Sequence, residues 1–189
     1  MIGTLKNSVW GCVEMGIFMM KEAVTRFDGS PLSMRRSFWV PVLALFVTTL
    51  GLYNFQNFSQ RPMFLAVFIV GAIFALIKYA AFLYVVFLWA RLVKRSEHYR
   101  KFIVMNNWLF LVQTVSFLPV FLSNTYGDHE KSLGYMLIGV MYCYMVLLFM
   151  SSRLFDIKPS DAIMVPLASV AVNVAVMVIF GKMGGMIIL

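Results

Sequence analysis

Acidic residues are scarce in this chain, and each of them lies outside its long apolar runs. The 189 residues include eight acids against sixteen lysines and arginines. The acids are Glu14, Glu22, Asp28, Glu97, Asp128, Glu130, Asp156 and Asp161. A proton relay built on carboxylates inside a membrane is therefore not encoded by this chain alone.

Cysteine and histidine are equally sparse. Cys12 and Cys143 are too far apart to suggest a disulfide framework or metal-ligand spacing, so both are interpreted as small packing residues. His98 and His129 fall in loops predicted on opposite sides of a membrane. The sequence carries no metalloprotease, P-loop or nucleophile-elbow motif. It therefore predicts no catalytic residue, no metal site, no cofactor and no enzymatic activity.

Apolar residues, in contrast, make up 61% of the chain, whereas soluble domains contain roughly 45–50%. They gather in five continuous runs, and a helix needs about 20 such residues to cross a bilayer. Because the runs do not alternate with polar residues, they predict helices and not barrel strands. The fold class is an all-α integral membrane protein, a five-helix transmembrane bundle over residues 31–189. The expected spans are about 37–53, 63–90, 102–122, 133–150 and 162–180.

Basic residues are distributed unevenly between the two sides of this bundle. Most lie before the first span, between the second and third, or between the fourth and fifth. Those residues are Lys6, Lys21, Arg26, Arg35, Arg36, Arg91, Lys94, Arg95, Arg100, Lys101, Arg153 and Lys158. The positive-inside rule then places the N-terminus in the cytoplasm and the C-terminus outside an inner (plasma) membrane.

Residues 1–30 are expected to form an amphipathic helix on the cytoplasmic side, followed by a turn into the first span. Apolar residues recur along residues 2–27 at helical spacing, at Leu5, Val9, Val13, Met20 and Val24. Two arrangements fit this pattern: a helix anchored at the membrane interface, or a helix packed under the bundle. Glu14 interrupts the apolar stretch, so a cleavable signal peptide is not expected.

One cation interrupts the second span. Lys78 lies in the middle of an apolar run, where a charge costs roughly 2.5–3.5 kcal/mol. The span lengths place Gln113 and Asn173 at a similar depth, and their amide carbonyls can accept hydrogen bonds from an amine. These three residues form the candidate intramembrane polar site. Interhelical hydrogen bonds that specify packing and a functional site are both open interpretations.

A second polar group opens the third span and continues the basic loop before it. Basic residues beside a membrane attract anionic lipid by about 1 kcal/mol each. For the basic residues the alternative is the positive-inside bias itself, and for the two asparagines and the tryptophan it is a polar ring at the interface beside an anchoring tryptophan. The candidate head-group site comprises Asn106, Asn107, Trp108, Arg95, Arg100 and Lys101.

Two stretches of the sequence resemble a known group of proteins. The stretch His98–Trp108 followed by Gln113, and the turn Phe27–Ser30 with Arg36–Trp39, are similar to a family of uncharacterised small five-span inner-membrane proteins of alphaproteobacterial type. The five-span arrangement is more distantly similar to Yip1-like membrane proteins. The resemblance implies an inner-membrane location and no known enzymatic activity.

The sequence thus favours a non-enzymatic integral membrane protein that organises the membrane or holds partners. One alternative is a small transporter or channel subunit with a path along Lys78, Gln113 and Asn173. Another is a lipid-binding or lipid-moving protein, in which Lys78 meets a head-group phosphate. Expected partners are membrane lipids including anionic ones, further copies of the chain, or a different membrane subunit. Nucleic acid is not expected, because the positive charge is spread over short loops.

Overall fold

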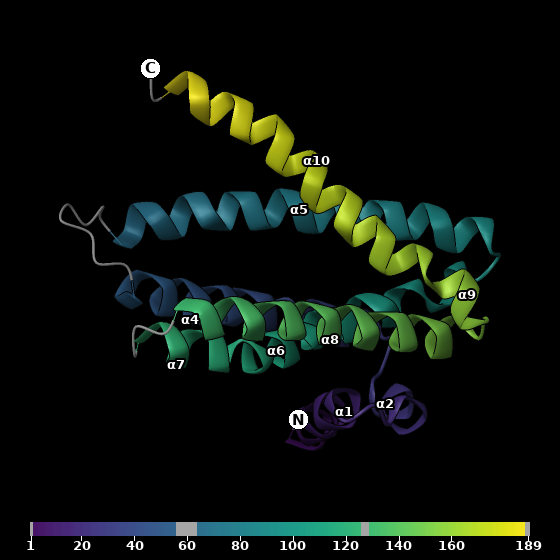
Figure 1. Ribbon diagram of the computed structural model, residues 1–189. Coiled ribbons are helices and arrows are strands. Elements are labelled where there is room, and N and C mark those ends of the chain that lie inside the picture. The colour runs from purple at the N-terminus through teal and green to yellow at the C-terminus, as the bar shows by residue number, and fades with distance from the viewer. Residues whose placement is uncertain (1, 56–63, 126–128, 188–189) are drawn as a thin grey trace.

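The computed structural model describes residues 2–55, 64–125 and 129–187, and every regular element in these ranges is a helix (Figure 1). In chain order the elements are α1 (Ile2–Gly16), α2 (Met20–Arg26), α3 (Pro31–Ser37), α4 (Trp39–Phe55), α5 (Phe64–Leu92), the 3-10 helix η1 (Ser96–His98), α6 (Tyr99–Ser116), α7 (Leu118–Thr125), α8 (His129–Phe155), α9 (Pro159–Ala162) and α10 (Met164–Ile187).

Four segments within the described ranges are long and apolar enough to cross a membrane, as an integral membrane protein requires. They overlap four of the expected spans, and their ends differ from the expected ends by up to six residues. The remaining expected span, 37–53, corresponds to α4, which is shorter at 17 residues. The four segments are Phe68–Leu92, Ser96–Val120, Lys131–Phe155 and Pro159–Ile179.

The third expected span is not one continuous helix. It is divided at Phe117 into α6 and α7. The Phe117 amide still bonds back to the Gln113 carbonyl at 3.1 Å. Pro119 follows closely, and its ring lacks an N–H and clashes with the preceding turn, which explains the interruption.

Three helices end in the same way, with a non-glycine residue in the left-handed region. Phe18, Lys94 and Asp156 have φ values of 61°, 57° and 51°. In each case the next amide donates to the carbonyl five residues earlier, at 2.8 Å after Phe18 and after Lys94 and at 3.1 Å after Asp156. This is the Schellman pattern, which satisfies carbonyls that the helix end would leave without donors.

The N-terminal stretch expected to be one helix folds instead as a hairpin of α1 and α2. The left-handed turn at Phe18 reverses the chain. Among the residues of the expected apolar stripe, Leu5, Val9 and Val13 are exposed, whereas Met20 is buried. The hairpin packs on α6 and α8, as in the alternative that placed this segment against the bundle.

The bundle is arranged around α6. Figure 1 shows α4, α6, α7 and α8 in one layer, with α5 and α10 on one face and the α1–α2 hairpin on the other. Every residue from Phe102 to Leu109 is buried. Their neighbours in the core include Met15 of α1, Val86 of α5 and Met150 of α8. The hairpin and α5 therefore cover opposite sides of the central helix.

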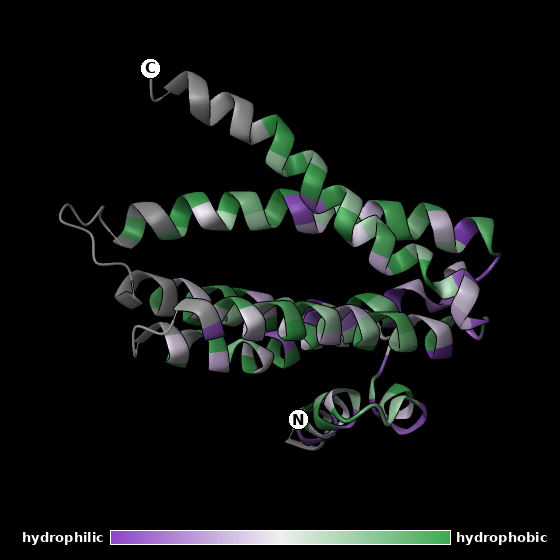
Figure 2. Ribbon diagram, in the orientation of Figure 1, coloured by the Kyte–Doolittle hydropathy of each residue, from purple (hydrophilic) through white to green (hydrophobic). Residues whose placement is uncertain are grey.

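Polar residues gather at one end of the bundle. Figure 2 shows hydrophilic colour around α9, where α5 and α8 end and α6 begins. We call this the basic end, because Arg91, Lys94, Arg95, Arg153 and Lys158 lie there. These are five of the twelve basic residues that the sequence assigns to the cytoplasmic side.

Candidate functional site

Lys78 lies at the middle of α5, at the boundary between a packed half and an open half of that helix. It shares a helical face with Phe82 and Val86, which are buried, and with Gly71 in the other direction. A Cβ atom built on Gly71 would have nothing within 4 Å. Among the residues whose exposure is described, none from Leu65 to Ala81 is buried. The close packing of α5 therefore begins only after Lys78.

The Lys78 side chain is partly exposed, and the described part of the chain offers its ammonium no hydrogen-bond or ion-pair partner. α10 packs on α5 and crosses it near the middle, which is where Lys78 lies along the helix (Figure 1). The sequence predicts that the charge of Lys78 needs a compensating group. None of the described residues supplies one.

The other two members of the expected polar layer do not bond to Lys78. The Asn173 amide donates to the Ser169 carbonyl of its own helix at 2.9 Å. Gln113 is partly exposed, and its side chain has no hydrogen-bond partner among the described residues. Within the described ranges, the three residues do not form a hydrogen-bonded network.

The register between α5 and α6 explains why Gln113 does not bond to Lys78. It is fixed by the Tyr79 hydroxyl, which donates to Asn107 Oδ1. Asn107 Nδ2 in turn donates to Ser37 Oγ at 2.7 Å, and Ser37 Oγ donates to the Met34 carbonyl at 2.8 Å. Gln113 lies six residues beyond Asn107, about 9 Å further along the helix. Span lengths alone align Lys78 with Gln113, but this register brings Asn107 to the level of Lys78.

Tyr79 and Ser37 are partners of Asn107 that the sequence does not predict. The available signal was the position of Tyr79 inside an apolar span, because a buried tyrosine hydroxyl usually finds a hydrogen-bond partner. Ser37 gives a weaker signal, since it lies at the end of a short helix among basic residues. The resulting cluster joins α3, α5 and α6.

The residues expected to contact lipid head groups separate into two sets. Asn106, Asn107 and Trp108 are buried, with Asn107 fully enclosed, so in this structure they lie inside the protein. Arg100 is exposed, and Arg95 pairs with Asp156 at 3.6 Å. The basic members therefore lie at the surface of the basic end, while the asparagines and the tryptophan belong to the packing of α6.

Lys101 has a structural contact as well as a charge. A Cβ atom at Gly29 would lie 3.1 Å from Lys101 Cβ, so the turn before α3 packs closely on the start of α6. The neighbouring Asp28 accepts from the Ser30 amide at 3.1 Å and from Ser33 Oγ at 3.0 Å. These serines are the main reason that the pKa of the Asp28 carboxyl lies below its ordinary value. The carboxylate thus shapes the turn into α3.

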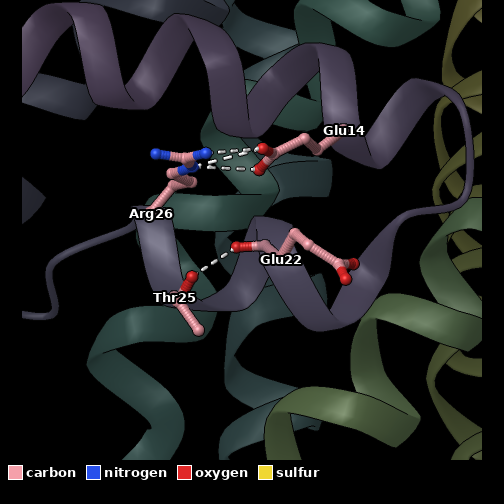
Figure 3. Close-up of polar contacts among 4 residues, drawn as sticks. All are labelled: Glu14, Glu22, Thr25 and Arg26. Atoms are coloured by element: carbon pink, nitrogen blue, oxygen red, sulfur yellow. Dashed lines mark hydrogen bonds and ion pairs between the residues drawn. The ribbon is translucent and has the colours of Figure 1, made fainter.

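The α1–α2 hairpin is closed by an ion pair. Figure 3 shows Glu14 of α1 and Arg26 of α2 pointing toward one another. Arg26 Nε and Nη2 both donate to Glu14 Oε1, at 3.2 and 3.1 Å. Glu14 is buried, but 46% of the Arg26 side chain is exposed, so the pair contributes about 1 kcal/mol or less. Its main effect is to align the two helices.

Cys12 is the thiol on the hairpin that faces the bundle. Its Sγ donates to the Trp108 carbonyl at 3.5 Å, and burial raises the pKa of the thiol to about 11. The thiol is therefore protonated at neutral pH, which makes it a poor nucleophile and metal ligand. Within the described ranges, no three His, Cys, Asp or Glu side chains are grouped so as to hold a metal ion.

Comparison of the chain with family models, curated proteins and solved structures found no match.

Proposed function

We propose that this chain is a non-enzymatic integral protein of the inner membrane that holds a partner membrane protein and organises the membrane around it. The supporting observation is the uneven burial of its long helices. In the most apolar window of the α6 span half of the residues are buried, against 11% in α5. A long apolar helix that its own chain covers so little has surface for a neighbouring membrane helix.

The proposal includes five membrane crossings, with α4 as the first. At 17 residues α4 is about 25 Å long, slightly less than the roughly 30 Å of a hydrocarbon core. Its residues from Trp39 to Phe55 contain no charged side chain. Five crossings place the two ends of the bundle's chain on opposite sides, with the basic end in the cytoplasm.

A reporter enzyme active only outside the cytoplasm is expected to be active when fused after Leu189. The same reporter fused before Met1 is expected to be silent, because five crossings separate the two ends of the chain. Activity is measured in intact cells. A silent fusion at Leu189 together with an active one before Met1 would reverse the orientation, and equal activity at both ends would contradict five crossings.

The function itself is tested by extracting the chain from its native membrane within a patch of lipid and identifying by mass spectrometry what accompanies it. We expect a second membrane polypeptide in a fixed molar ratio. A single lipid species in a fixed ratio, without a polypeptide, would favour the lipid-binding alternative. The extracted chain without either would contradict the proposal.

The transport alternative makes a different prediction for Lys78. Lys78→Met is expected to keep cellular abundance and stability against unfolding at the wild-type level or above it, because no described residue bonds the ammonium. The measurements are membrane abundance and denaturant titration in micelles, with Lys94→Met as a control for loss of one charge at an exposed site. Ion flux through vesicles containing the wild type that Lys78→Met abolishes would overturn the scaffold function in favour of transport.

A further inference from the structure

We propose that the open half of α5 is a docking surface for one transmembrane helix of a different protein, and that this helix carries an acidic side chain at the level of Lys78. The docking surface is defined by Gly71, Ala75 and Lys78, which recur along one face of α5. This inference rests on the proposed function, because it names the chemistry of the partner and the face that the partner covers.

The charge of Lys78 indicates what the partner supplies. An isolated charge near the bilayer centre is costly, and the described part of the chain holds no anion beside this one. A lone carboxylate in a partner helix bears a similar cost. An ion pair between Lys78 and that carboxylate reduces the free-energy cost of both charges at once. Each side chain therefore selects the other.

A second copy of this chain does not provide that carboxylate. The acids lie in the hairpin, in loops or at the ends of the apolar runs. Glu14 is already paired with Arg26, and Asp156 with Arg95. No acid therefore reaches the middle of α5 in either a parallel or an antiparallel copy that shares the same membrane depth.

The shape of the surface favours a helix over a lipid. Gly71 has open space beside it, and Ala75, one turn later, is only partly buried. Small residues at this spacing let another helix backbone approach closely. A lipid phosphate belongs at the interface, about 15 Å from the bilayer centre, whereas Lys78 is at the midpoint of α5.

The test uses the full-length protein and a synthetic probe in vesicles of zwitterionic phospholipid. The probe is an apolar helix of about 20 residues with one glutamate at its centre, and the matched probe has glutamine there. Binding is measured by fluorescence energy transfer between labelled probe and labelled protein. We expect the glutamate probe to bind about tenfold more tightly than the glutamine probe. Lys78→Met removes this preference, whereas Lys94→Met keeps it.

Three results would overturn the docking site: equal binding of the two probes, a glutamate preference that persists in Lys78→Met, or self-association of the protein that excludes both probes. The measurement is then repeated with an anionic phospholipid in the vesicles. Loss of the glutamate preference there assigns Lys78 to lipid and also overturns the proposal. If the preference is absent while native-lipid extraction still yields a partner in a fixed ratio, the docking site fails and the proposed function stands.

Discussion

Replacing Asn107 by leucine is expected to lower the free energy of unfolding by about 1–3 kcal/mol, although leucine has nearly the same size. Asn107 is fully buried, and its amide accepts from Tyr79 and donates to Ser37. The substitution leaves the Tyr79 hydroxyl without this acceptor, and Ser37 loses its donor. The cost is measured by denaturant titration in micelles and by the abundance of the protein in the membrane.

Two further variants show whether this cost comes from the hydrogen bond. Tyr79→Phe combined with Asn107→Leu removes both partners, so the double variant is expected to be more stable than the sum of the single variants predicts. Gln113→Leu changes an amide on the same helix that has no described partner, and its effect is expected to stay within about 0.5 kcal/mol. Additive single effects at Tyr79 and Asn107, or an equal loss from Gln113→Leu, would show that the cluster does not hold α5 on α6.

This cluster shows where the sequence is sufficient and where it is not. Continuous apolar runs predict the long helices, because a helix in lipid must satisfy its backbone within itself. They do not predict how far one helix slides along another. The register depends on single side-chain bonds such as that from Tyr79 to Asn107. Span lengths therefore give Lys78 and Gln113 the same depth, although the bond brings Asn107 to the level of Lys78.

The location of the polar residues near the start of α6 is similarly hard to predict from the sequence. Asn106, Asn107 and Trp108 suit a membrane interface by composition, and interfacial positions are where these residues are enriched or tolerated. The structure encloses them because the chain supplies covering helices on two sides, with the α1–α2 hairpin on one face and α5 on the other. Both covering elements come from other parts of the chain. The sequence of the third span alone therefore does not predict that these three residues are buried.

The hairpin was missed for a local reason. Chain reversals are usually marked by glycine, proline or asparagine, whereas this one uses Phe18 in the left-handed region. The conformation is stabilised from outside the turn. The Phe18 ring packs edge-on against Tyr142 and Phe149 at 5.5 and 5.9 Å, and the Tyr142 hydroxyl donates to the Gly16 carbonyl. Contacts between residues so distant in sequence are not visible in local patterns.

A methyl group at Gly11 is expected to destabilise the protein by about 1–3 kcal/mol, the usual cost of overfilling a packed site. The Cβ of Gly11→Ala would lie 2.6 Å from Phe27 Cε2 and 3.0 Å from Arg26 Cβ. The Phe27 ring is buried and lies 6.5 Å from the Trp108 ring. It has little freedom to move, so α1 and α2 must separate. The free energy of unfolding, again from denaturant titration in micelles, measures the cost.

Gly134→Ala provides the matched control, because it adds the same methyl group to a helix where nothing lies within 4 Å of the new Cβ. Alanine is the better helix former by about 1 kcal/mol, so this variant is expected to be neutral or slightly stabilising. The difference between the two variants then isolates the contact of Gly11 with Phe27 from helix propensity. If Gly11→Ala and Gly134→Ala changed the stability equally, the hairpin would not be packed closely enough to cover α6. Another element would then have to shield Asn106 and Asn107 from their surroundings.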